Sequence, residues 1–441
     1  MIAQILFAII LLAGIGYFIS NIRKAIRNIK LGKPSHRNDR KDERLKNMIL
    51  KAFGQQKMFK RPIPALLHLV VYLGFIIINI EVLEIMIDGL FGTHRVFAPM
   101  GTFYNFLIGA FEILAGLVIV AVILFWIRRN ILKLSRFQKP EMKGWPKKDA
   151  NWILYFEMVL MSAFLIMNAA DHKLQLLKHG HYYFKEGIAG SFPVSSLFMN
   201  LLPGNPETLV WIERGAWWFH IIGILVFLNY LYWSKHLHIL LAFPNTYYAK
   251  LPPLAKLENL ETVKKEVALM MDPNADPYAA PADDAEEPGR FGAKDVFDLE
   301  WIYLLNAYTC TECGRCTDVC PANQTGKKLS PRKIMMDVRD RLEEVGKNID
   351  KNSGKFVDDG KSLLDYITKE ELWACTSCNA CVEECPVEND PLDIIIAVRQ
   401  YLVMEESAAP SELNMMFTNI ENNGAPWQYS QMDRLNWADE E

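Results

Sequence analysis

Five long apolar segments dominate the first half of the chain. Each has the roughly 20 residues of helix that crossing a bilayer requires. The segments cover residues 1–20, 63–87, 104–127, 151–170 and 212–233. Aromatic residues lie at several of their ends, as in "WIERGAWWF" and "YLYW", which is typical of membrane–water interfaces. We therefore expect residues 1–248 to form a five-helix transmembrane bundle, with a soluble all-helical core as the alternative.

Lysine and arginine are concentrated in alternate loops. The loop 21–62 contains fourteen of them and 128–148 contains eight, whereas 88–103 contains one and 171–211 contains three. Because basic residues favour the cytoplasmic side, the N-terminus should lie outside and the second half of the chain in the cytoplasm. No basic residue precedes the first segment, which favours an uncleaved anchor over a signal peptide. We thus predict a multi-pass protein of the bacterial inner membrane.

The second half of the chain differs in composition. Residues 249–441 are polar and contain all eight cysteines, whereas all nine histidines precede them. We divide this half into a linker at 249–292 that is rich in Pro, Ala and Asp, a domain at 293–405, and a C-terminal tail at 406–441 for contact with a partner. The net charge of −3 gives no reason to expect nucleic acid as a partner.

All eight cysteines belong to two copies of one pattern, "CTECGRCTDVCP" from Cys310 and "CTSCNACVEECP" from Cys375. The spacing C-x2-C-x2-C-x3-C-P is that of bacterial ferredoxins, in which the fourth cysteine ligates the other cluster. On that rule one [4Fe–4S] cluster is assigned to Cys310, Cys313, Cys316 and Cys385, and the other to Cys375, Cys378, Cys381 and Cys320. Two alternatives are structural zinc, which usually takes two C-x2-4-C pairs, and a disulfide framework, which is expected in short secreted chains.

Helices are expected between the two cysteine loops. The intervening residues 321–374, 54 in number, include "PRKIMMDVRDRLEEV" and "GKSLLDYITKEELW", both with a helical period. The predicted fold class is therefore all-α, with a five-helix transmembrane bundle followed by a cytoplasmic α-helical ferredoxin domain.

Three histidines lie in or next to the apolar segments, where polar groups are costly and indicate function. His68 and His238 both lie at the cytoplasmic end of the bundle and are the first choice as axial ligands of a b-type haem. His220 precedes His238 by 18 residues, or five helical turns, so the two would share a face roughly 27 Å apart and serve different haems. We rank His236 lower, because it faces roughly the other way. The alternative for each is a hydrogen-bonded histidine at the interface.

Further ionisable residues gather in the outer half of the bundle. Carboxylates and a histidine at that depth could exchange the protons that quinone chemistry requires, with exposure to water or helix capping as the alternative. The candidates are Glu81, Glu84, Glu112, Asp171 and His172. The loop histidines are expected to be solvated; these are His36, His94, His179 and His181.

The membrane half resembles the gamma subunit of respiratory nitrate reductase and the membrane subunit of heterodisulfide reductase. The resemblance rests on five spans, an outer N-terminus and histidines 18 residues apart at span five. It implies that spans two and five ligate b haems, through His68, His220 and His238, and that quinone binds in the membrane. The gamma subunit has a second histidine ten residues along span two, where this chain has Ile78. His220 would then need another partner, such as His172, or would serve a quinone site.

The second half is similar to the iron–sulfur subunits of heterodisulfide reductase and of anaerobic glycerol-3-phosphate dehydrogenase. The segments "RFGAKDVFDLEWIYLLNAYTCTECGRCTDVCPA" and "NIENNGAPWQ" resemble fused membrane iron–sulfur oxidoreductases that pass electrons from electron-transfer flavoprotein to menaquinone. Those proteins continue into cysteine-rich CCG domains, and this sequence contains no CCG. The resemblance therefore implies a CCG-domain partner subunit.

The sequence as a whole predicts a membrane electron-transfer subunit of a quinone oxidoreductase. Its expected cofactors are two [4Fe–4S] clusters and one or two b haems, with menaquinone as substrate. The alternatives are a haem-free membrane anchor that relays electrons for a soluble oxidoreductase, and a redox sensor.

Overall fold

The computed structural model describes residues 1–179, 189–254, 256–257, 259–273, 290–428 and 430–439, and these ranges contain helices and no β-strand. The predicted all-α class is confirmed. Five helices are long and apolar enough to cross a membrane. They are α1 (Ile2–Ile29), α3 (Pro62–Phe91), α4 (Thr102–Asn130), α5 (Trp145–Leu176) and α6 (Pro206–Tyr230).

The five long helices form a closed ring in chain order, in which α6 returns to pack against α1. Their ends follow local chemistry. Pro62 and Pro206 start α3 and α6, where a missing backbone N–H costs nothing. Gly92, at φ +71°, ends α3 in the left-handed conformation that glycine adopts most easily. Large apolar side chains such as Ile9 and Phe106 cover the outer surface of the ring, as expected for helices in lipid.

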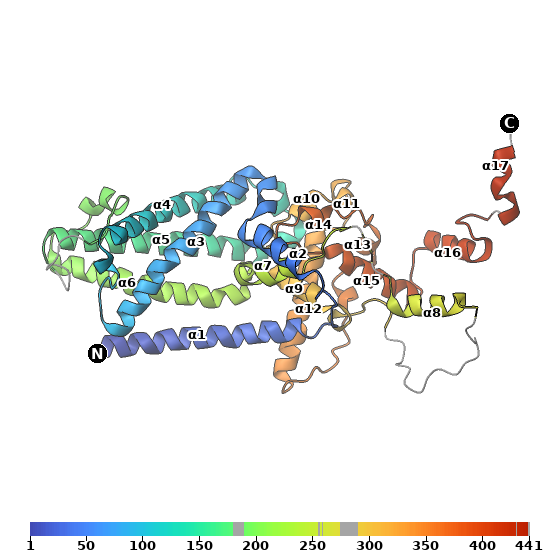
Figure 1. Cartoon of the computed structure of the whole chain (residues 1–441), viewed down its shortest axis with the longest axis horizontal. Helices are drawn as coiled ribbons and strands as arrows, with labels where there is room; N and C mark the ends of the chain where they lie inside the picture. The colour runs from blue at the N-terminus through green and yellow to red at the C-terminus, as the bar shows by residue number, and fades with distance from the viewer. Residues whose placement is uncertain (180–188, 255, 258, 274–289, 429, 440–441) are drawn as a thin grey trace.

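A second group of helices lies against one end of the ring (Figure 1). It comprises α9 (Trp301–Thr309), α10 (Arg315–Asp318), α11 (Pro321–Gln324), α12 (Pro331–Lys351), α13 (Lys369–Trp373), α14 (Ala380–Glu384) and α15 (Pro391–Met404). Helix α12 forms the centre of this group, because apolar residues recur every three or four positions and are all buried. They are Ile334, Met335, Val338, Leu342, Val345 and Ile349.

The segments that connect the long helices dock the second group onto the ring. Helix α7 (His238–Tyr247) packs against α9, and Ile29 and Leu237 join the same apolar core. Lysines and arginines of the basic loop 21–62, which includes α2 (Lys41–Met48), pair with acids of the second group. Arg61, for example, lies 2.6 Å from Asp318 and 2.7 Å from Glu384. The basic loop therefore also serves as an interface within the chain.

The linker and the tail contain helices that the sequence did not indicate. Helix α8 (Glu261–Met271) lies within 249–292, although residues 274–289 of that linker lie outside the described residues. In the tail, α16 (Ser411–Asn423) and α17 (Asn436–Asp439) stand away from the remainder (Figure 1). Both α8 and α16 expose apolar side chains, including Met270 and Met415.

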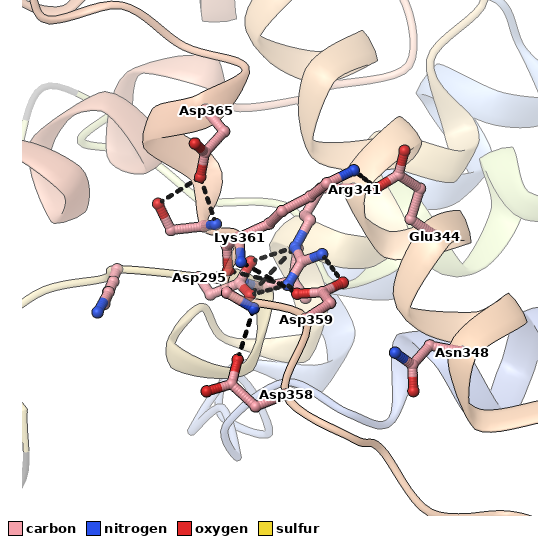
Figure 2. A network of polar contacts seen from close by, with 12 residues as sticks. Asp295, Arg341, Glu344, Asn348, Asp358, Asp359, Lys361 and Asp365 are labelled. Atoms are coloured by element: carbon pink, nitrogen blue, oxygen red, sulfur yellow. Dashed lines mark hydrogen bonds and ion pairs between the residues drawn. The ribbon is translucent and has the colours of Figure 1, made fainter. Parts of the chain in front are cut away.

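A buried arginine closes the long connection between the cysteine loops. Figure 2 shows Arg341 of α12 between Asp295 and Asp359, and its shortest contact with each carboxylate is 2.6 Å. The side chain of Arg341 is fully buried. It also donates to the backbone carbonyl of Lys361 at 3.1 Å, so that one guanidinium joins two segments to α12.

Replacing Arg341 by methionine should destabilise this region by about 3–5 kcal/mol, because two carboxylates lose a buried partner. Thermal unfolding of the detergent-solubilised protein measures the loss. Lys361→Met is the matched control, since its ion pair with Glu344 is about half exposed and should contribute at most about 1 kcal/mol. Equal losses in the two variants would contradict this account.

Candidate functional site

The two cysteine loops have the same backbone course. Each begins where a helix ends, at Thr309 and at Trp373. In each loop the residue before the second cysteine and the residue after it adopt positive φ. These are Glu312 (+53°) and Gly314 (+72°) in the first loop, and Ser377 (+56°) and Asn379 (+64°) in the second. The paired left-handed residues curl each loop tightly enough to direct three thiols towards one centre.

The eight thiols separate into two sets of four, each around its own hollow. The hollows contain about 370 Å³ and 340 Å³ of space without atoms. The first is lined by Cys310, Cys313, Cys316 and Cys385, and Cys381 lines both hollows. The second is lined by Cys320, Cys375, Cys378 and Cys381. Each hollow therefore takes three cysteines from one loop and the Cys-Pro cysteine from the other, which is the crossed arrangement that the ferredoxin rule predicts.

The thiols are buried and weakly acidic in the absence of a metal. Burial raises the pKa of Cys310 to about 11 and that of Cys385 to about 12, so that bound iron must supply the positive charge that keeps them as thiolates. Backbone N–H groups already point at sulfur, as from Asn389 to Cys385 Sγ at 3.2 Å and from Ser377 to Cys375 Sγ at 3.4 Å.

The surroundings of the two hollows differ. Charged groups from the connecting loops surround the first: Arg315 donates to Lys57 O at 3.3 Å, and the fully buried Arg332 lies 2.7 Å from Glu141. Glu312 is buried between Lys235 and Arg339. Burial alone would raise the pKa of Glu312, but these two cations hold it at about 2. In contrast, Cys378 at the second hollow is exposed. Buried charged residues thus contact the first loop, whereas the second loop has an exposed cysteine.

The structure brings His68 and His238 together at the same end of the ring. Their ring centroids are 6.5 Å apart. Metal–nitrogen bonds of about 2 Å place two imidazoles on opposite sides of one metal at about 6 Å between centroids, so the pair fits a shared iron. Nδ1 of His238 donates to Lys235 O at 3.0 Å, which leaves Nε2 for a ligand. Nδ1 of His68 is buried and has no partner among the described residues.

One expectation about the histidines is not met. Helix α6 ends at Tyr230, and Ser234 is extended before α7 begins at His238. His220 and His238 therefore do not lie on one continuous helix, and the spacing of five turns has no structural meaning. His220 is buried in α6 and its Nδ1 donates to Leu160 O at 3.0 Å. His236 lies 3.6 Å from Glu157 and packs against His238.

The half of the ring farther from the iron–sulfur helices contains a buried polar network centred on Arg95. Its guanidinium lies 2.6 Å from Asp171 and donates to Asn168 and Tyr104 at 2.9 Å. The Tyr104 hydroxyl in turn donates to Glu84 at 3.1 Å. The network therefore unites two of the predicted proton-exchange residues, Glu84 and Asp171, from α3 and α5.

The other predicted proton-exchange residues have separate environments. Glu81 is buried on α3, and its Oε2 has no hydrogen-bond partner among the described residues. Glu112 accepts hydrogen bonds from Ser195 Oγ (2.5 Å) and from two backbone N–H groups of the same loop. The ring of His172 stacks on Phe192, with centroids 4.7 Å apart, and its Nδ1 lies 3.3 Å from Ser196 Oγ.

Sequence reasoning missed the centre of this network and one of its neighbours. Arg95 is the single basic residue of the loop 88–103, a signal that could have been used. The expectation that His94 is solvated was wrong: its side chain is almost fully buried, 3.5 Å from Asp171 and 2.8 Å from Arg214. His36 and His179 are exposed as expected, and His181 lies outside the described residues.

Residues 309–389 match the family model described as a 4Fe-4S dicluster domain. This match covers both cysteine loops and supports a domain with [4Fe–4S] clusters in this part of the chain. The homologues of the chain are iron–sulfur oxidoreductases, as its resemblance predicted. No solved structure matches the chain.

Two relatives are similar to nearly the whole chain. The probable iron-sulfur-binding oxidoreductase FadF of Bacillus subtilis is 30% identical over 99% of the chain, which covers 61% of that protein. The EtfAB:quinone oxidoreductase of Syntrophomonas wolfei is 26% identical over 98% of the chain, which covers 59% of it. One subunit of the dihydromethanophenazine:CoB–CoM heterodisulfide reductase of Methanosarcina mazei is 27% identical over 33% of the chain and 36% of its own length. The chain therefore spans about three fifths of the first two relatives.

Gly314→Ala should prevent assembly at the first hollow. An added Cβ at this left-handed residue would collide with the guanidinium of Arg332. We expect iron and acid-labile sulfide in anaerobically purified protein to fall to roughly half of the eight of each that two clusters contain. Gly326→Ala is the control, because Gly326 also has positive φ but has no atom within 4 Å of an added Cβ. Full iron content in Gly314→Ala would refute the assignment.

Proposed function

We propose that the protein is a membrane electron-transfer subunit that connects a cytoplasmic donor to menaquinone through two [4Fe–4S] clusters and a b-type haem. One observation carries the proposal. Glu312 of the first cysteine loop pairs with Lys235 in the turn that precedes His238, whereas Cys378 of the second loop is exposed. The second cluster, the first cluster and the haem would then follow one another from the protein surface towards the membrane, as one-electron carriers in series require.

The protein residues have defined tasks in this proposal. The cysteines hold the clusters, and the backbone N–H groups and buried cations near them adjust the affinity for an electron. His68 and His238 would hold the haem iron. Burial lowers the pKa of His238 to about 3, so its imidazole is neutral, as iron ligation requires.

Menaquinone is proposed to react in the outer half of the ring, where it would need groups that exchange protons. Glu81 is a suitable group, because it is buried and its Oε2 lacks a partner among the described residues. Glu84 lies three residues further along α3, in the network that Arg95 and Tyr104 form with Asp171. Glu112 and His172 hold the neighbouring loop that contains Ser195 and Ser196.

The proposed location is the bacterial inner membrane, with the iron–sulfur helices in the cytoplasm. The loops richest in lysine and arginine meet these helices, and such loops are typically cytoplasmic. The name of the Syntrophomonas relative supports electron-transfer flavoprotein as the donor and quinone as the acceptor. A CCG-domain subunit is the second proposed partner.

Purified protein should show the reduced α-band of a b-type haem, and His68→Ala and His238→Ala should each abolish it because a single axial imidazole remains. Optical spectra and pyridine haemochrome analysis measure the loss. His36→Ala is the control, since His36 is exposed. Full haem content in both ligand variants would exclude this pair. A complete absence of haem from the unaltered protein would favour the haem-free relay.

Glu81→Gln should slow menaquinone-dependent reoxidation of the reduced protein by about 10²-fold, the lower range for loss of a general acid–base group. Cluster and haem contents should not change. Stopped-flow absorbance with a soluble menaquinone analogue measures the rate. Glu207→Gln, at the exposed start of α6, is the control. An unchanged rate in Glu81→Gln would remove Glu81 from the quinone reaction.

A further inference from the structure

Lys235 lies in the short turn between α6 and α7, three residues before His238, and its side chain is buried. The ammonium group forms an ion pair with Glu312 and donates to Pro146 O at 2.7 Å. It also lies 3.7 Å from Asp149, which accepts the backbone N–H of Lys235 at 3.2 Å. Several elements therefore fix this one side chain, and none of the roles described above uses it.

Glu312 reaches Lys235 from inside the first cysteine loop. Glu312 lies between Cys310 and Cys313. Its backbone has the left-handed conformation that residues other than glycine seldom adopt. Its second carboxylate oxygen lies 2.8 Å from Arg339 of α12. The corresponding residue of the second loop, Ser377, has the same backbone conformation without a charge. The loop therefore folds without a carboxylate at this position, so Glu312 must have another role.

The opposite end of Lys235 contacts the histidine pair. Its backbone carbonyl accepts the hydrogen bond from Nδ1 of His238 at 3.0 Å. A continuous series of bonds thus leads from Cys310 through the Glu312 carboxylate and Lys235 to the His238 ring. A shift of this lysine would move the loop of the first hollow and the imidazole together.

We propose that Lys235 is a positioning residue shared by two redox sites, whose side chain fixes the first cysteine loop and whose carbonyl orients His238, and that the Lys235–Glu312 ion pair sets the reduction potential of the first cluster. The inference rests on the proposed function, because it assumes iron at both places.

The ion pair gives a distinctive electrostatic signature. A cation beside a cluster favours the added electron, and an anion opposes it. Removing the charge of Lys235 should therefore lower the potential, whereas removing the charge of Glu312 should raise it. A purely structural pair would behave differently, because breaking it from either side would disturb the same loop in the same way.

The test is a redox titration of the whole detergent-solubilised protein, followed by electron paramagnetic resonance, on Lys235→Met and Glu312→Gln. We expect one of the two cluster signals to shift to lower potential in the first variant and to higher potential in the second. The double variant should lie between them, and Lys235→Arg should stay near the unaltered value. If Lys235→Met fails to accumulate, the upward shift in Glu312→Gln decides the question alone.

Lys250→Met is the matched control. Lys250 also joins the membrane half to the iron–sulfur helices, through an ion pair of 2.9 Å with Asp393 and with similar burial. It should leave the shifting signal unchanged. Shifts in the same direction, or none, in Lys235→Met and Glu312→Gln would overturn the inference while clusters and haem remain. Absence of haem from the unaltered protein would instead overturn the proposed function, and the shared role of Lys235 with it.

Discussion

The pairing of buried charge where the membrane helices meet the iron–sulfur helices is the interaction on which the rest of this structure depends. Arginines and lysines of the connecting loops and of α12 are buried or half-buried there, and an unpaired charge in such a place costs several kcal/mol. Arg332 with Glu141, Arg61 with Glu384 and Lys235 with Glu312 meet that requirement. These pairs fix the cysteine loops against the end of the ring where His68 and His238 meet.

The pairing of buried charges also explains why the two cysteine loops, which share one sequence pattern, have different surroundings. Both use paired left-handed residues to gather three thiols, so their local chemistry is nearly equal. The first loop is enclosed by charged residues from the membrane half, whereas Cys378 of the second reaches the surface. Two clusters in such different electrostatic surroundings would differ in reduction potential, which gives a chain of carriers its direction.

Buried charges are also paired in the half of the ring farther from the iron–sulfur helices. Apolar helices can bury Glu84 and Asp171 only because one guanidinium, that of Arg95, lies between them and is shared with Tyr104. Glu81 lies near this network with an oxygen that no described residue satisfies. A polar group without a partner in such a place is costly, and it indicates where a proton-exchanging ligand would find a bond.

The sequence by itself determined the helical class, the five spans and the grouping of the cysteines, because apolar length and C-x2-C-x2-C-x3-C-P spacing are local properties of the chain. It also singled out His68 and His238, since a histidine in an apolar segment stands out. Only the tertiary structure decided that Ser234 breaks the helix before His238, that His94 and Arg95 are buried, and that Lys235 meets Glu312. These facts depend on partners tens of residues away, which become neighbours only when the chain packs.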